Sequence, residues 1–332
     1  MQAPARADYV QVYFTLFAYF QQEREQIVHY GHPFEYTDQV LMVFFTMMSI
    51  RRITAFKAKR RWLMHHLHVA IALGFEQIPH RTTLSRRYKT LYPILQAFIA
   101  FVGRWAEALH PQFGSRVLIE DASLFKAHGP VWHQSNRLAG RIPEKLRNLD
   151  QDASWRKSAY HGWVYGYSLH LTCNRSGFPK LVQVETASIA ESRALEQKKE
   201  ALFALDPRAI TADNAYFKAM RVRQWATKGV ILLAPAAKWQ KGRYARAYHR
   251  FIAKTPFSDW LKCRKTAIEP VFDLFSKVLG TANNQKQLPL QRLPNVRTFL
   301  CLGVLAVQIA MIVNNVFGLP LRQISNLLTA FS

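Results

Sequence analysis

The sequence predicts a mixed α/β protein in two parts: an all-helical domain over residues 1–112, and a domain over 113–332 built on a mixed sheet with a C-terminal helix. Long apolar stretches with few helix breakers fill the first part. Beyond residue 113, short apolar runs of strand length alternate with helical segments. With 332 residues, 49% of them hydrophobic, the chain can bury two sizeable cores.

Residues 71–95 of the helical domain have the outline of a helix-turn-helix. A helix is predicted to end near Phe75, and a second one to begin at Thr82 or Thr83, because either threonine is a good N-cap. In this motif the start of the second helix enters the DNA major groove. The cations that would contact DNA from it are Arg86, Arg87 and Lys89. An ordinary helical pair with a solvated basic face explains the pattern equally well.

The sheet of the second domain is predicted to begin with a strand and a hairpin. RVLIED (116–121) is a short apolar run that ends in acids. GWVYGYSLHLT (162–172) alternates with period two, NRSG (174–177) is a turn, and FPKLVQVETA returns as a second strand.

Helices and strands are predicted to alternate after the hairpin. Ser188 and Glu191 form a capping box that opens a helix through Ala204. A strand RAITAD, a helix NAYFKAMRVRQWATKG and a strand VILLAP follow, from residue 208 to 235. The order β, ββ, α, β, α, β, α describes a mixed sheet with helices packed on it.

Two basic insertions interrupt this pattern, at about residues 125–160 and 235–258. The first has no clear period and predicts a long loop. From Lys238 to Lys265, nine Lys and Arg are interleaved with aromatic residues, the mixture that a nucleic-acid groove uses. A solvated loop anchored by its aromatic rings is the alternative. The predicted DNA-binding cations here are Lys238, Lys241, Arg243, Arg246, Arg250, Lys262, Arg264 and Lys265.

The charge balance points to a polyanionic partner. The chain has 45 Lys and Arg against 21 Asp and Glu, a net charge of +24, spread over its whole length. Nucleic acid is the commonest such partner; a ribosome-bound or merely cationic protein is the alternative. Three scattered cysteines without a CxxC pair fit a reducing cytoplasm. The apolar run 299–313 contains Gln308 and is shorter than a membrane span, so a buried helix and no membrane are predicted.

Two acids stand at the C-terminal end of an apolar strand, where open α/β sheets bind ligands: Asp121 after RVLIE and Asp213 after RAITA. A buried carboxylate there is costly unless something compensates its charge. Each aspartate alone is more readily explained as a cap of backbone amides. Both together, in a chain this basic, predict ligands of a divalent metal, with Mg²⁺ as the ion that prefers such a set.

A third carboxylate is predicted from the helix in DWLKCRKTAIEPVFDLFSKVLG. Glu269 and Asp273 lie one turn apart, with Lys262 and Lys265 on the same side. Lys277 follows eight residues after Glu269, so this helix could hold both metal and DNA phosphate. Pro270 disfavours helix at Glu269, which predicts that the helix begins or kinks there.

These motifs, in this order, resemble the DDE transposases of bacterial insertion sequences, which have an RNase H-like catalytic core. The matching pieces are VLIEDAS with Asp121, the hairpin, ITADNAY with Asp213, and RKTAIEPVFDLFSK with Glu269, over roughly residues 113–316. The helical N-terminal region resembles the family's end-binding and dimerising part. The chain departs from the family at the glutamate signature, where Lys262, Lys265 and Ser276 replace Tyr, Arg and Lys. The His-Asp-Ser that often follows the hairpin is Ala190, Glu191 and Ser192.

The resemblance implies metal-dependent cleavage at the element's ends and strand transfer into target DNA. It implies Asp121, Asp213 and Glu269 as catalytic residues and ligands of two Mg²⁺ ions, for which Mn²⁺ could substitute. It also implies phosphate contacts at Lys265 and Lys277, duplex DNA with terminal inverted repeats as partner, and a homodimer in the bacterial cytoplasm. A nuclease of the same fold that cuts without joining, and a silent transposase-derived DNA-binding protein, are the alternatives.

Overall fold

A computed structural model describes residues 3–24, 35–158, 162–237, 239–240, 242–282 and 285–332 of the chain. The chain divides into two compact units. Unit 1 comprises Met1–Val102, Ala127–Asp152 and Leu274–Ser332, and unit 2 comprises Gly103–Lys126 and Ala153–Asp273. The sequence predicted one boundary, at residue 112, and that division into domains stays a prediction.

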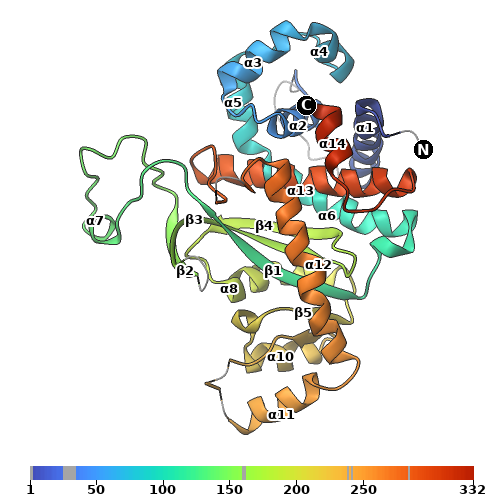
Figure 1. Cartoon of the computed structure of the whole chain (residues 1–332), viewed down its shortest axis with the longest axis vertical. Coiled ribbons are helices and arrows are strands. Elements are labelled where there is room, and N and C mark those ends of the chain that lie inside the picture. The colour runs from blue at the N-terminus through green and yellow to red at the C-terminus, as the bar shows by residue number, and fades with distance from the viewer. Residues whose placement is uncertain (1–2, 25–34, 159–161, 238, 241, 283–284) are drawn as a thin grey trace. The chain divides into compact units, whose positions relative to one another are not determined.

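Helices build unit 1 (Figure 1). Those that lie wholly within it are α1 (Arg6–Glu23), α2 (Asp38–Ile50), α3 (Phe56–His65), α4 (Leu67–Leu73), α5 (Arg81–Thr90), α7 (Gln134–Leu138), α13 (Leu293–Val316) and α14 (Ser325–Phe331). Two further helices, α6 (Tyr92–Leu109) and α12 (Phe257–Val278), begin in one unit and end in the other.

Helix α13 is the core of unit 1, packed against α1, α2 and α5. Every residue from Thr298 to Asn314 is buried. The Gln308 side chain that interrupts the apolar run donates a hydrogen bond to the Ile99 carbonyl at 3.0 Å, which satisfies its amide nitrogen. By length and composition α13 could cross a membrane, but 94% of its most apolar window is buried inside the protein. The run 299–313 therefore forms a buried helix, as the sequence predicted.

A six-stranded mixed sheet is the centre of unit 2 (Figure 1). Its strands are β1 (Val117–Lys126), β2 (Ser154–Ser158), β3 (Gly162–Cys173), β4 (Pro179–Thr186), β5 (Ala209–Thr211) and β6 (Ile231–Leu233). One edge of β3 pairs with β1, and the other pairs first with β2 and then with β4, all antiparallel. β5 and β6 continue from β1 in parallel. This order of strands is the predicted RNase H-like core, and it confirms the α/β fold class.

Helices cover both faces of this sheet. They are α8 (Glu191–Gln197), α9 (Lys199–Phe203), α10 (Ala219–Ala226), α11 (Arg243–Ile252) and the part of α12 up to Asp273; the short 3₁₀ turns are η1 (Pro111–Phe113) and η2 (Asn214–Tyr216). Successive residues of a strand point to opposite faces. Because Lys198, between α8 and α9, bonds Glu120 and Arg264 of α12 bonds Asp121, these two segments lie on opposite faces.

Several predicted boundaries differ from the structure. β1 extends five residues beyond Asp121, because Asp121–Lys126 continue to pair with β3, so Asp121 lies inside the strand. Ser188 does not cap a helix: its amide donates to the Ser154 hydroxyl, and two short helices follow, one from Glu191 and one from Lys199. The insertion at 125–160 holds α7 and β2 as well as loop, and the one at 235–258 holds α11. α12 starts at Phe257 and runs through Pro270 rather than beginning at Glu269.

Candidate active site

Asp121 lies inside β1, and Asp213 lies two residues beyond the end of the neighbouring parallel strand β5. The β1–β5 register pairs Ile119 with Thr211, and each aspartate follows two residues later. Two residues along a strand return to the same face, and neighbouring strands are about 4.8 Å apart. Asp213 is still extended, with φ −80° and ψ −176°, so its backbone continues the strand direction. The fold therefore brings the two predicted aspartates to one level of one face.

The local contacts of the two carboxylates differ. Asp213 is the N-cap of η2, and its Oδ1 accepts a hydrogen bond from the Ala215 amide at 2.8 Å. Asp121 accepts from the Ala122 amide through Oδ1 and from Arg264 Nη1 through Oδ2 at 2.7 Å. The Arg264 and Asp121 side chains are 21% and 14% exposed, so this ion pair is largely shielded from water.

The electrostatics of Asp121 reflect a crowded acidic site. Burial first, and then the charges of Asp213 and Glu120, raise the pKa of Asp121 to about 6, against the lowering effect of Arg264 and the Ala122 amide. A carboxylate that resists ionisation in the free protein gains most from a cation placed beside it. The site therefore favours occupation by a positive charge.

Glu191, the first residue of α8, belongs to the same site although the sequence did not predict it. Burial raises the pKa of Glu191 to about 7, and Asp213 and Asp121 contribute to the rise. Arg156 of β2 pairs with Glu191 at 2.5 Å and opposes the shift. The sequence carried one indication of this role: Glu191 stands at the position where the DDE transposases that the chain resembles often have the Asp of a His-Asp-Ser motif.

Tyr216, at the end of η2, lies fully buried beside these acids. Burial raises the pKa of Tyr216 far above its ordinary value, and Glu120, Glu191, Asp121 and Asp213 all act in the same direction. Its hydroxyl has no hydrogen-bond partner among the residues that the structure describes. A buried hydroxyl without a partner is costly to the folded state.

The predicted third carboxylate lies apart from these contacts. Glu269 is exposed on α12, and no hydrogen bond or ion pair joins it to another described residue. Arg264, five residues earlier on the same helix, is the α12 side chain that reaches Asp121. Within the described ranges, no group of three or more His, Cys, Asp or Glu side chains is placed to hold a metal ion.

On the opposite face of β1, a separate polar network stabilises the sheet. Glu120 accepts hydrogen bonds from Lys198 Nζ at 2.6 Å and from the Thr172 hydroxyl at 2.5 Å, and all three side chains are buried. A buried carboxylate paired and bonded in this way is satisfied without a further cation. The network fixes β1 against β3 and against the segment between α8 and α9.

The predicted DNA-binding cations fall into four groups. Arg87 is buried, 5% exposed, and pairs with Asp38 of α2 at 2.6 Å, so it is a structural cation and not a surface contact. Arg264 is engaged with Asp121. Lys238 and Lys241 lie outside the described residues. The other predicted cations are exposed: Arg86, Lys89, Arg243, Arg246, Arg250, Lys262, Lys265 and Lys277.

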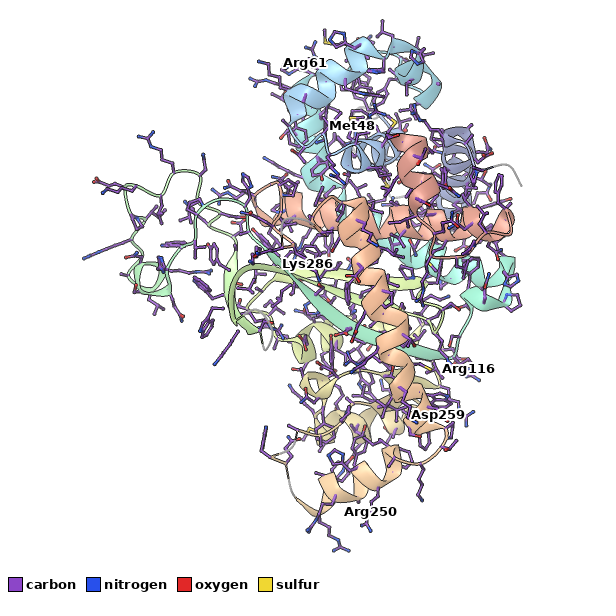
Figure 2. The ribbon with its side chains drawn as sticks, viewed as in Figure 1. Met48, Arg61, Arg116, Arg250, Asp259 and Lys286 are labelled. Atoms are coloured by element: carbon purple, nitrogen blue, oxygen red, sulfur yellow. The ribbon has the colours of Figure 1, made fainter. Side chains whose placement is uncertain are left out.

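The helix α11 arranges three of these exposed cations on one side. Arg243, Arg246 and Arg250 are exposed, whereas Ala245 and Tyr248 are buried, and Figure 2 labels Arg250 on this helix. The Tyr248 hydroxyl donates to the Leu232 carbonyl at 2.6 Å and so ties α11 to β6. The basic segment predicted from the sequence is thus an amphipathic helix held by an aromatic anchor.

The site thus combines a mixed sheet with two aspartates whose carboxylate oxygens are donors of the kind that hard divalent cations take. The family model of the transposase DDE domain matches residues 112–293, more than half of the chain. The chain therefore belongs to the DDE transposase family.

Two solved structures are similar to the chain at low identity. One is a cryo-EM structure of the piggyBac transposase synaptic complex with hairpin DNA, at 10% identity and a TM-score of 0.45, covering 98% of this chain and 79% of that chain. The other is the Mos1 transposase paired-end complex with the left transposon end, at 11% identity and a TM-score of 0.21, covering 86% and 84%. No curated protein sequence matches the chain.

Proposed function

We propose that this protein is a metal-dependent DDE transposase that cleaves the ends of an insertion sequence and joins the released 3′-hydroxyl to target DNA. The observation that carries the proposal is that Asp121 in β1 and Asp213 just beyond the end of β5 each follow the register pair Ile119–Thr211 by two residues. Family membership supports the same chemistry. A nuclease that cuts without joining, and a silent DNA-binding derivative, stay as alternatives.

The donor set of the site fits a hard divalent cation in part. Asp121 and Asp213 supply carboxylate oxygens, and the raised pKa of Asp121 marks a place where added positive charge is favourable. These two residues would hold Mg²⁺, or Mn²⁺ in its place. Two such ions, when bound, activate an attacking oxygen and stabilise the leaving oxygen of a phosphodiester. Glu269 is proposed as the third ligand from the family resemblance, and Glu191 is the other carboxylate available.

The neighbouring groups would orient the two carboxylates and neutralise the charge of DNA phosphates. Arg264 holds one oxygen of Asp121, and the Ala122 amide holds the other, which fixes the plane of the carboxylate. The Ala215 amide fixes Asp213 in the same way. Lys265 and Lys277, exposed on α12, would neutralise phosphates of bound DNA. The proposed partners are duplex DNA with terminal inverted repeats, the target duplex and a second copy of the chain, in the cytoplasm.

The test is cleavage of duplex DNA that carries the gene's own flanking sequence, with and without Mg²⁺ or Mn²⁺. Asp213→Asn is expected to keep DNA affinity and to lose metal-dependent cleavage by at least about 100-fold, because the ligand set is broken while the positive surface is intact. Asp259→Asn is the matched control: Asp259 is an exposed aspartate at the start of α12, paired only loosely with Lys262 at 3.5 Å (Figure 2).

Cleavage by Asp213→Asn at the wild-type rate would contradict the proposed site. Glu269→Gln and Glu191→Gln in the same assay separate the two candidates for the third carboxylate. The nuclease alternative predicts cut ends without joined products.

A further inference from the structure

Helix α2 ends in a motif whose central position normally belongs to glycine. The Ile53 amide donates to the Met48 carbonyl at 2.9 Å, across the last turn of α2, and Arg52 between them has φ +59°. This is a Schellman ending, in which the residue in the left-handed region is usually Gly because a Cβ is strained there. Arg52 takes this position although its backbone conformation disfavours it.

Helix α12 ends in the same motif, and there the position is glycine. The Thr281 amide donates to the Ser276 carbonyl at 2.8 Å, and Gly280 has φ +69°. The Arg52 side chain lies across Gly280: a Cβ built on Gly280 would stand 2.6 Å from Arg52 Nε. The Arg52 side chain therefore occupies space that a side chain at position 280 would fill.

Two hollows in unit 1 meet at Arg52 and Gly280. One, of about 470 Å³, is lined also by Lys277 and Arg322. The other, of about 400 Å³, is lined also by His128, with Gln287 from the loop that contains Lys286 (Figure 2). Among the described residues that line the two hollows there is no Asp or Glu. The two hollows share Arg52, and the Lys and Arg residues that line them are Arg52, Lys277 and Arg322; together they are here named the Arg52 groove.

The Arg52 guanidinium is exposed and makes no hydrogen bond or ion pair with any residue that the structure describes. A structural explanation is that its charge favours the carbonyl ends of α2 and α12. That role does not require a strained arginine, because Lys277 already places a cation in the last turn of α12. Backbone strain kept at an exposed cation, inside a groove without acids, points instead to an anionic ligand.

We propose that the Arg52 groove binds the phosphate backbone of duplex DNA and that Arg52 is a direct phosphate contact. The inference rests on the proposed function, which supplies the duplex, and it adds a binding surface outside the acidic site. The guanidinium presents several donors in a rigid fork that matches phosphate oxygens. Lys277 and Arg322 supply further positive charge along the same surface.

The experiment uses the full chain and duplex DNA of the gene's flanking sequence, without divalent metal, and measures Kd over a series of salt concentrations. Arg52→Gly is expected to raise Kd about five-fold near 0.15 M salt, and to make the slope of log K against log salt shallower by about one, because one phosphate contact is lost. Its Tm should equal or exceed that of the wild type, since glycine is the preferred residue at this backbone position.

Two control variants separate the phosphate contact from other effects. Arg52→Lys keeps the charge and is expected to keep the slope. Arg116→Gln removes one exposed cation that does not line the groove, and is expected to leave both Kd and slope nearly unchanged. The slope does not depend on the fraction of folded protein, so it distinguishes a lost contact from a destabilised fold.

An unchanged Kd and slope for Arg52→Gly would overturn the inference. A lowered Tm with an unchanged slope would also overturn it and leave Arg52 as a structural cation. The proposed function fails through a different result, the absence of metal-dependent cleavage by the wild type. Binding without metal can still depend on Arg52 in that case, so the two failures are distinguishable.

Discussion

At Asp121, burial and neighbouring negative charge both act against the ionised form of the carboxyl group. The side chain is 14% exposed, and Arg264 offsets only part of the cost. Glu191 and Tyr216 experience the same field from the other side of the site. The residues gathered here are therefore strained electrostatically in the free protein, and this strain is relieved when a cation or a proton arrives.

The pKa of Asp121 predicts a pH-dependent stability difference. Because the folded pKa of about 6 lies above the ordinary 3.8, the folded state binds this proton more tightly, and the corresponding stability is lost as pH rises through 6. Asp121→Asn cannot titrate. Its free energy of unfolding, relative to the wild type, should therefore rise by about 2 kcal/mol from pH 4 to pH 7.

Urea denaturation without divalent metal, at several pH values, measures this difference. Glu191→Gln offers a second case. Because the pKa of Glu191 is raised to about 7, the stability that its proton contributes is lost as pH rises through about 7. A difference between Asp121→Asn and wild type that stays constant from pH 4 to pH 8 would contradict the electrostatic account of the site.

At the scale of single elements, α5 illustrates how one helix serves both packing and surface. Its buried side packs against α3 and α13, and Arg87 reaches Asp38 and the Tyr36 carbonyl, whereas Arg86 and Lys89 face solvent. The helical period alone cannot show which of the adjacent residues Arg86 and Arg87 is structural. Arg87 is the one that pairs with an acid, Asp38, 49 residues earlier in the chain.

Removing the acid of the Arg87–Asp38 pair should destabilise unit 1. Asp38→Asn leaves the Arg87 guanidinium, whose side chain is 7% exposed, without its counter-charge, so the free energy of unfolding should fall by about 2 kcal/mol. Arg86→Gln, on the exposed side of the same helix, should change it by less than about 0.5 kcal/mol. Equal effects of the two variants in urea denaturation would show that the pair contributes nothing specific.

The elements that could be predicted from sequence are those with a strong local signal. The alternation over 162–172, the turn at 174–177 and the apolar run over 299–313 each encode an element within a few residues, and all three are found. α11 was missed because its stripe of Ala245, Tyr248 and Ile252 is sparse among many cations. The Ser188 cap failed because a tertiary bond to Ser154 replaced the local one.

The candidate site was predictable only where strand position carried the information. Each aspartate follows an apolar run, and the parallel pairing of β1 with β5 up to Ile119–Thr211 gives the two residues corresponding places in the fold, although β1 continues past Asp121. The Arg264–Asp121 pair joins residues 143 positions apart, and no local pattern encodes it. Glu191 gains its place from the packing of α8 beside the sheet, which the sequence does not specify. The role of Glu269 stays a prediction.

For the molecule as a whole, the excess of 45 Lys and Arg over 21 Asp and Glu should dominate its encounter with DNA. The logarithm of the association constant for duplex DNA is expected to fall against log salt with a slope of about −4 or steeper, since each phosphate contact releases condensed counterions. Fluorescence anisotropy over a salt series measures the slope. A nearly flat response would contradict backbone contacts as the main source of affinity.

The packing of α13 against α1, α2 and α5 has a consequence for biosynthesis. A ribosome completes α2, in which every residue from Leu41 to Ile50 is buried in the finished protein, long before it reaches Leu293. Until then α2 can pack only against earlier elements such as α1, α4 and α5, and the apolar side that α13 covers in the finished protein stays exposed, which favours aggregation of the nascent chain. A prematurely terminated product that stops before α13 would stay in that condition permanently, which makes such fragments prone to degradation.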